Sequence, residues 1–261
     1  MLNAAELDEQ GPVLVTPASE TTLWTRPEEL EAALAGQFLP DWAAEAYGTF
    51  KASTFGIVAQ QRGTLLYAFA PSLEERTDRL RVQLLIGEYL RHLKALTREE
   101  AAFALMVLFV DPRSLPPELE AHHQAVWDLL QFLHEEDDFP WAPGVPTDPD
   151  HPLWSFCLGE SPLFVNISSP AHRQRQSRNL GSALTLIIQL REGFDLVAPD
   201  TPTGRRVRET IRNRIESFDG TPTYPELGYY QDPRNREWKQ YGIPDGNQSR
   251  PARCPFHTRK E

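Results

Sequence analysis

The sequence contains no long apolar run. No stretch is long enough to span a bilayer, and the N-terminus shows neither a basic start nor an apolar signal segment. The two cysteines, Cys157 and Cys254, are too few for a disulfide framework, and no histidine pair lies beside either at zinc-binding spacing. These absences favour a cytoplasmic protein in a reducing compartment, without a membrane partner.

Several catalytic and nucleotide-binding signatures are also missing. There is no GxGxxG after a strand, no Walker loop, no HExxH and no GxSxG elbow. The chain has 261 residues, of which 40% are hydrophobic, so it can bury a sizeable core. We therefore expect a globular protein whose site must be found from less familiar residues.

Charge is distributed unevenly along the chain. Residues 1–150 hold 25 acidic and 10 basic residues, whereas residues 151–261 hold 12 acidic and 16 basic ones. The arginines of the second part are interleaved with aromatics, glycines and prolines rather than clustered with lysines. This pattern favours a pocket for a small anion and argues against a nucleic-acid partner.

Hydrophobic periodicity predicts an α+β (mixed α/β) fold with a central mixed, largely antiparallel sheet flanked by helices. Residues 1–22 are expected to form a loose arm and residues 23–261 a single domain with an extended, aromatic-rich C-terminal tail. Helices are predicted over 27–40, 72–96 (capped by Ser72), 116–137 and 201–220, whose Ile211, Ile215 and Phe218 should face the core. Strands are predicted in a hairpin over 55–70 with Gly63 in its turn, at 103–110, in a second hairpin around "GESP", and at 183–190.

One loop concentrates unusual chemistry. "SSPAHRQRQSRNLG" (168–181) lies between two predicted strands and contains His172, Arg173, Arg175 and Arg178 but no acid. Neighbouring guanidinium groups should lower the pKa of His172 and keep its imidazole neutral, as a metal ligand must be. The loop is therefore compatible with a haem pocket in which arginines bind the propionates, with a phosphate or nucleotide site, or with a merely structural histidine.

The C-terminal tail offers further candidates. Cys254, in "CPFH", is either a thiolate haem ligand or a buried, inert thiol. Trp238 and Tyr241 either clamp the tail to the core or form the wall of a pocket. Three carboxylates are candidates for holding a cationic substrate: Glu160, Glu237 and Asp245.

Three further histidines, His122, His123 and His134, lie on or near an acidic helix, and we interpret them as part of a solvated face. Cys157 lies within a predicted strand, and we expect it in the core.

Ordered strings over about 152–256 resemble the YqcI/YcgG family. They are "PLWSFCLGESPLFVNISSPAHRQRQSRNLG", "LIIQLREGFD", "IRNRIESFDGTPTYPELGYY" and "NREWKQYGIPDGN…CPF". The upstream "FGIVAQQRGTLLYAF" extends the resemblance to almost the full length. Two departures are visible: the Pro-Cys pair usual before that segment is absent, and the usual Gln-Pro-Arg is here Gln189, Leu190 and Arg191.

The resemblance implies a haem-dependent N-oxygenase that hydroxylates a guanidino or amino nitrogen of an arginine-like molecule. It implies haem b, dioxygen as co-substrate, a small cationic substrate and an electron-donor reductase. The expected roles are His172 as proximal ligand (Cys254 the alternative), Asn179 as its hydrogen-bonded support, the loop arginines with Trp238 and Tyr241 around the cofactor, and Glu160, Glu237 or Asp245 on the guanidinium. The competing hypothesis is a non-catalytic haem- or anion-binding sensor or carrier.

Overall fold

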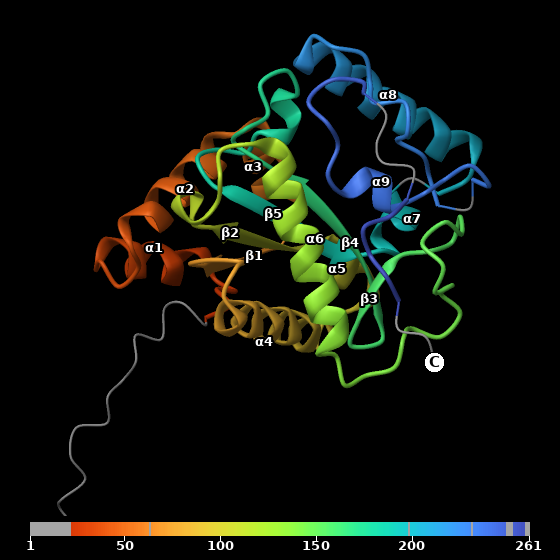
Figure 1. Cartoon of the computed structure of the whole chain (residues 1–261). Coiled ribbons are helices and arrows are strands. Elements are labelled where there is room, and N and C mark those ends of the chain that lie inside the picture. Colours follow the sequence, from red (N-terminus) through yellow and green to blue (C-terminus); the bar gives the residue numbers. More distant parts are fainter. Residues whose placement is uncertain (1–21, 63, 198, 231, 249–252, 259–261) are drawn as a thin grey trace, which may run out of the picture.

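The computed structural model describes residues 22–62, 64–197, 199–230, 232–248 and 253–258, so most of the expected arm at 1–22 lies outside the described residues. A five-stranded sheet crosses the molecule in the order β1-β2-β5-β4-β3 (Figure 1). β1 and β2 are parallel, whereas the β2–β5, β5–β4 and β4–β3 pairs are antiparallel. The predicted mixed, largely antiparallel sheet is confirmed. The strands are β1 (Thr64–Ala70), β2 (Ala104–Val110), β3 (Phe156–Leu158), β4 (Ser161–Ser168) and β5 (Leu184–Leu190).

Helices lie on both sides of this sheet (Figure 1). The first three precede the sheet in sequence, and α4 and α6 alternate with its strands. The helices are α1 (Pro27–Ala35), α2 (Asp41–Ala52), α3 (Thr54–Arg62), α4 (Arg76–Leu93), α5 (Arg98–Phe103), α6 (Leu119–Glu135), α7 (Gly193–Val197), α8 (Pro202–Asp219) and α9 (Trp238–Tyr241). In the part of the chain that is described, no helix is both long and apolar enough to cross a membrane.

The two faces of the sheet bury different sets of residues, because successive strand residues point to opposite sides. The face covered by α4 and α6, which we call the α6 face, carries Leu66, Leu108 and Leu186. The opposite face, which we call the α2 face, carries Tyr67 and Phe109, which pack against α1 and α2.

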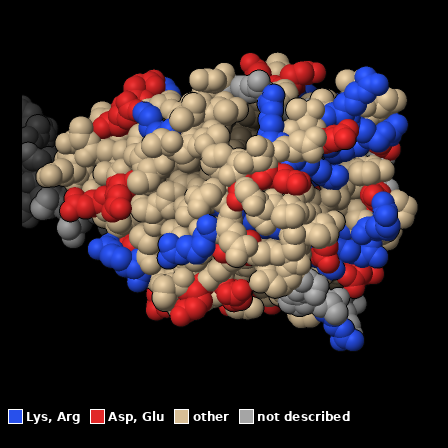
Figure 2. Space-filling model, turned by 90° about the horizontal axis from the view of Figure 1, so that it is seen from above, with Lys and Arg blue, Asp and Glu red and all other residues tan. Residues whose placement is uncertain are grey.

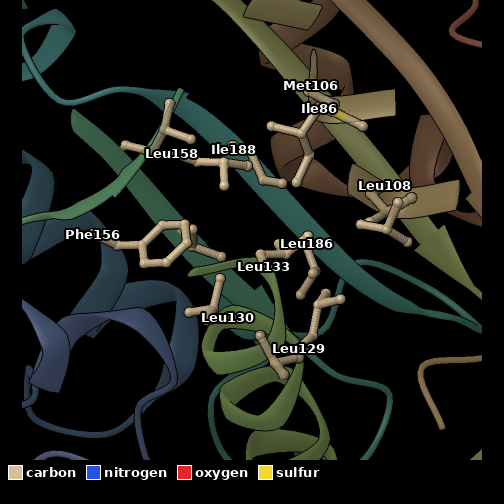
Figure 3. Packing of buried hydrophobic residues seen from close by; sticks show 14 of the residues in the cluster. Ile86, Met106, Leu108, Leu129, Leu130, Leu133, Phe156, Leu158, Leu186 and Ile188 are labelled. Carbon is tan, nitrogen blue, oxygen red and sulfur yellow. The ribbon is translucent and has the colours of Figure 1, made fainter. Parts of the chain in front are cut away.

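The α6 face is tightly packed. In Figure 3, Leu129, Leu130 and Leu133 of α6 lie over Leu186 and Ile188 of β5. Burying a leucine side chain of this kind stabilises the fold by about 1.5–3 kcal/mol. The C-terminal tail also joins this core, since the side chains of Trp238, Tyr241, Cys254 and Phe256 belong to the same buried cluster. Trp238 and Tyr241 thus lie in the core, as the tail-clamp interpretation expects, and their predicted contact with a cofactor stays a prediction.

Local signals explain where two helices begin. Thr97 accepts a hydrogen bond from the Glu100 backbone, and the Glu100 carboxylate accepts one from the Thr97 backbone, a capping box that starts α5. α8 begins at Pro202 after Thr201, whose side chain accepts a hydrogen bond from the Gly204 backbone. α8 ends at Gly220, which adopts the left-handed conformation (φ 65°) that glycine tolerates best.

The predicted hairpin over 55–70 is wrong. Residues 54–62 form α3, and β1 follows it as a single strand; Gly63 lies outside the described residues. β1 pairs with β2 on one edge, and on the other edge Tyr67 exchanges backbone hydrogen bonds with Trp24 (2.8 and 2.9 Å). β2 occupies one edge of β1 and Trp24 the other at Tyr67. Residues 54–62 therefore do not pair with β1 as the predicted hairpin required.

Two expectations about helices are also corrected. The helix predicted from Ser72 begins at Arg76, because Ser72 Oγ instead accepts a hydrogen bond from the Glu74 backbone (3.0 Å) within a turn. On α8, the side chains of Ile211 and Phe218 are 44% and 49% exposed, so they do not face the core.

The histidines of α6 are a further correction. His122 and His123 do not lie on a solvated face, since α6 buries both, and His122 Nδ1 lies 2.7 Å from Ser169 Oγ of the 168–181 loop. Cys157 lies buried in β3, as predicted.

Candidate functional site

The structure places His172 in the interior. Its side chain is fully buried, with Nε2 3.1 Å from the carbonyl oxygen of Ile243 and Nδ1 3.3 Å from that of Ser169. Burial is the largest cause lowering the pKa of His172, and the Arg178 charge adds to it. The lowered pKa favours the neutral imidazole, although both nitrogens lie within hydrogen-bond distance of backbone carbonyls, and these contacts oppose the shift. Its role as an iron ligand stays a prediction, and one that requires the ring to leave these contacts.

The loop arginines contact the C-terminal tail. The buried Arg175 guanidinium donates to the carbonyl oxygens of Pro222, Pro244 and Gly246, and to Asn247. Arg178 donates to the carbonyls of Tyr241 (3.2 Å) and Gln240 (3.3 Å). The guanidinium groups predicted to bind propionates thus donate to backbone carbonyls in this structure, and the propionate contact stays a prediction.

Of three further predicted residues, Asn179 stabilises the same loop, whereas the side chains of Arg173 and Glu160 are exposed. Asn179 donates to the carbonyl oxygens of His172 (3.2 Å) and Pro170 (3.4 Å), so it is a hydrogen-bonded support of the His172 turn. Arg173 is exposed. Glu160 is also exposed, in the β3–β4 turn, where Gly159 and Glu160 both adopt positive φ.

Asp245 binds backbone rather than a substrate in this arrangement. One carboxylate oxygen, Oδ1, accepts hydrogen bonds from the backbone N–H groups of Arg173 (2.9 Å), Gln174 (2.9 Å) and Arg175 (3.1 Å). These bonds hold the pKa of Asp245 below its usual value against the opposing effect of burial. Asp245 therefore fastens the tail to the loop.

A cleft opens on the α2 face, beyond the sheet area that α1 and α2 cover. Its volume is about 800 Å³, and its floor includes Leu105 of β2, Phe164 of β4 and Gln189 of β5. Its walls come from α3, the end of α5, α7, α8 and the 227–230 segment. Exposed large apolar side chains gather here: Phe55, Val58, Phe103, Phe194 and Ile211. An exposed apolar concavity of this size is typical of a ligand-binding site.

Basic side chains accompany the apolar walls. The lining contains Arg191, Arg208, Arg212 and Arg214, together with the acids Asp195, Asp200 and Glu237. Figure 2 shows a hollow in the face seen from above and Lys and Arg side chains gathered over the half of the molecule that carries α8. The expected pocket rich in arginine therefore exists, but α8 and the end of β5 supply its arginines instead of the His172 loop.

A buried ion pair lies at the inner end of the cleft. Arg191 Nε is 2.7 Å from Glu237 Oε2, and both side chains are more than 90% buried. Glu237 Oε1 accepts hydrogen bonds from Ser155 Oγ (2.6 Å) and the Tyr241 hydroxyl (3.0 Å). Burial raises the pKa of Glu237 to about 7, although Arg191 and the hydrogen bonds oppose the rise. Of the three carboxylates proposed from the sequence, the structure brings Glu237 to the cleft.

Aromatic rings fix the Arg191 guanidinium from two sides. Its central carbon lies 3.9 Å from the ring centroid of Tyr230 and 5.6 Å from that of Phe194. The Tyr230 hydroxyl donates to the Leu153 carbonyl (2.7 Å), which holds the ring in place. Sequence reasoning did not select Arg191 or Tyr230, although "QLR", where the family usually has Gln-Pro-Arg, was the available signal.

The cleft can be compared with the requirements of haem b. Its apolar walls, its volume and its arginines suit a flat apolar ring that carries two carboxylates. The expected axial ligands do not suit it, because neither His172 nor Cys254 lines the cleft. Among the described lining residues there is no histidine, cysteine or methionine, and the tyrosines Tyr229 and Tyr230 are present. The walls of the cleft therefore suit the group, whereas the two predicted axial ligands lie outside the cleft.

Comparison with known proteins identifies the family. The model of the YqcI/YcgG family matches residues 52–257, and the chain belongs to this family. The match includes the sheet, the cleft and the 168–181 loop, so these features are part of the family domain.

Three relatives are similar over large parts of the chain. DcsA of Streptomyces lavendulae, which is named "Putative N(omega)-hydroxy-L-arginine synthase", is 44% identical over 160 residues, 61% of this chain and 60% of that protein. YcgG of Bacillus subtilis (strain 168) is 31% identical over 84% of this chain and 89% of its own length. YqcI of the same organism is 34% identical over 63% of this chain and 65% of its own length. No solved structure matches the chain significantly.

Proposed function

We propose that this chain is an N-oxygenase that hydroxylates a guanidino nitrogen of an arginine-like molecule, with haem b as its cofactor and dioxygen as co-substrate. The observation that carries the proposal is the cleft on the α2 face, which combines apolar walls with both arginines and carboxylates. The 44% identity to a protein named for hydroxy-arginine synthesis supports the reaction class.

The reaction balances with an external electron donor. A guanidino N–H and one oxygen atom of dioxygen give N–OH, and the second oxygen atom leaves as water after uptake of two electrons and two protons. A reductase partner would supply the electrons. Haem b, when bound, would supply the activation of dioxygen.

The described residues suggest how the chain would handle the substrate. A guanidinium is planar and binds carboxylates through paired hydrogen bonds, so Asp200, which lines the cleft, is 42% exposed and already pairs with the Arg205 guanidinium, suits its capture. Glu237, whose pKa is raised to about 7, suits a group that takes up or releases a proton near neutral pH. The apolar walls would exclude water from the reacting nitrogen.

The experiment is to purify the chain from cells supplied with a haem precursor. We expect a Soret band and, with L-arginine, reductant and dioxygen, an N-hydroxy product detected by mass spectrometry. Ile211→Trp, which places a larger side chain in the cleft, should lower both haem content and product at least tenfold. Phe218→Trp is the matched control, because Phe218 is similarly exposed on the same helix and does not line the cleft.

Each outcome separates the proposal from its competitor. Haem binding without an N-hydroxy product from any guanidino compound or small amine tested would favour a non-catalytic haem carrier or sensor. Product formed by haem-free protein would overturn the haem-dependent mechanism. Equal effects of the two tryptophan substitutions would show that the cleft is not the site.

A further inference from the structure

The Arg191 side chain is deeply buried, yet not all of its guanidinium nitrogens have a hydrogen-bond partner among the described residues. It is 7% exposed, yet its Nη1 has no hydrogen-bond partner among the described residues. Its Nε is close enough to Glu237 for an ion pair, but the N–H does not point at a carboxylate oxygen in hydrogen-bond geometry. Leaving a buried charged donor unsatisfied costs considerable free energy. Arg191 also lines the ligand-sized cleft, so a ligand bound there is a candidate partner for this donor.

The surroundings determine what kind of ligand suits this donor. Tyr230 and Phe194 pack on the guanidinium and hold its plane, while the ion pair with Glu237 restrains its orientation. A guanidinium fixed in this way offers paired N–H groups to a planar anion, and a carboxylate matches that geometry.

A complementary acid lies beside it. Asp195 Oδ1 is 3.6 Å from Arg191 Nη2, longer than a direct hydrogen bond, and its side chain is 52% exposed. Arg191 and Asp195 both line the cleft and so present a positive and a negative group side by side. The α-carboxylate and α-ammonium of a free amino acid have the same arrangement with opposite signs.

We propose that Arg191, with Asp195 beside it, is the receptor for a carboxylate in the cleft, and that this carboxylate is the α-carboxylate of an amino-acid substrate. The inference rests on the proposed function for the identity of the substrate. It makes the substrate class a free α-amino acid with a guanidino side chain rather than a decarboxylated guanidine. A haem propionate presents the same chemistry, so the experiment must distinguish the two sources.

The experiment measures binding by calorimetry with three probes. L-Arginine carries both groups, agmatine lacks the carboxylate, and Nα-acetyl-L-arginine lacks the ammonium charge. We expect the wild-type chain to bind arginine about 10- to 100-fold more tightly than agmatine, the range that one charge-assisted hydrogen-bonded contact provides. Arg191→Gln should abolish this preference, and Arg191→Lys should restore part of it.

Two controls protect the interpretation. Arg206→Gln alters an exposed arginine of α8 that does not line the cleft, and it should leave the preference unchanged. Arg191→Gln leaves the Glu237 carboxyl buried without its ion-pair partner, which can prevent folding. The double variant Arg191→Gln/Glu237→Gln removes both charges together and should fold, again without the preference.

Haem content is measured on the same samples from the Soret band. Loss of the arginine preference with haem retained assigns the carboxylate to the substrate. Loss of haem with the preference intact assigns the bond to a propionate and overturns the substrate assignment. If folded Arg191 variants change neither quantity, the receptor itself is wrong. Retention of the arginine preference without any N-hydroxy product would overturn the proposed function and leave the receptor standing.

Discussion

The two faces of one sheet differ in how completely they are covered. On the α6 face, two helices and the C-terminal tail bury apolar side chains from all five strands. On the α2 face, α1 and α2 pack mainly over β1 and β2, and the β4–β5 part instead forms the floor of a cleft. The α6 face therefore contributes most of the buried apolar core, while the α2 face retains exposed apolar surface that a ligand can cover.

The arginines show the same division. Arg175 and Arg178 are buried and bound to tail carbonyls, so their hydrogen-bonding capacity is used within the fold. Arg191 is similarly buried and lines the cleft, but its Nη1 has no hydrogen-bond partner among the described residues. Burial is therefore common to these arginines, whereas the partners of their nitrogens distinguish Arg191, the proposed carboxylate receptor, from Arg175 and Arg178.

The largest expected contrast lies between the two faces. Leu130→Ala on the α6 face should lower the free energy of unfolding by about 2–5 kcal/mol, because it leaves a cavity in a packed core. Ile211→Ala in the cleft should change it by less than about 0.5 kcal/mol, because that side chain is already exposed. Urea unfolding of both variants measures the difference. Equal losses would contradict the division between a stabilising face and an open one.

A second, smaller effect tests the His172 loop. His172→Ala should lower the free energy of unfolding by about 2–4 kcal/mol, since it removes a fully buried ring and leaves the Ile243 carbonyl without that donor. Chemical denaturation and the Soret band should be measured on the same preparation. A variant of unchanged stability that loses its haem would instead favour the iron-ligand prediction over a structural role for this ring.

The pH dependence of stability sharpens this test. Burial lowers the pKa of both His172 and His122 in the folded state, so the unfolded chain takes up protons more readily. Stability from these groups is fully present above pH 6.5 and is lost as pH falls below that value, by up to about 1.4 kcal/mol per pH unit for each histidine. Urea unfolding between pH 7.5 and 5 should show this loss. His172→Asn should reduce the slope, and an unchanged slope would exclude His172 as a contributor.

The smallest effect is expected at Arg173. Arg173→Ala should change the free energy of unfolding by less than about 0.5 kcal/mol, because the side chain is exposed. Its backbone N–H would still donate to Asp245. Haem content should also stay constant, measured by absorbance against protein concentration. A large loss of haem would restore the sequence-based prediction of a propionate contact.

The sequence predicted much of the sheet because strand and helix periodicities survive in the fold. β2, β5 and the β3–β4 hairpin lie where the apolar runs and the "GESP" turn indicated. The segment at 54–62 was assigned wrongly, since its apolar residues also fit a strand and the parallel partner of β1 lies about 40 residues further on. Short apolar runs do not reveal which edge of a strand is already paired.

The sequence predicted a pocket rich in arginine, but it did not predict which segments of the chain line the cleft. The excess of arginine in the second part of the chain did indicate a basic pocket, and Glu237 does reach it. The His172 loop was chosen because its arginines have no acid nearby in sequence, but the partners of Arg175 include backbone carbonyls 47 to 71 residues away. Such partners carry no signal in residue type. Arg191 was passed over because it follows a buried strand, where its ion pair with Glu237 depends on tertiary contact.

The Asp245 contact also has a consequence for the order in which the protein is made. The three backbone N–H groups of the 173–175 turn bind the Asp245 carboxylate, which emerges from the ribosome some 70 residues later. Until then the turn has no native partner for them, and the pocket that encloses the His172 imidazole lacks the Ile243 carbonyl. Completion of the fold is thereby tied to the arrival of the final segment, so a nascent chain halted before residue 243 should remain a substrate for chaperones.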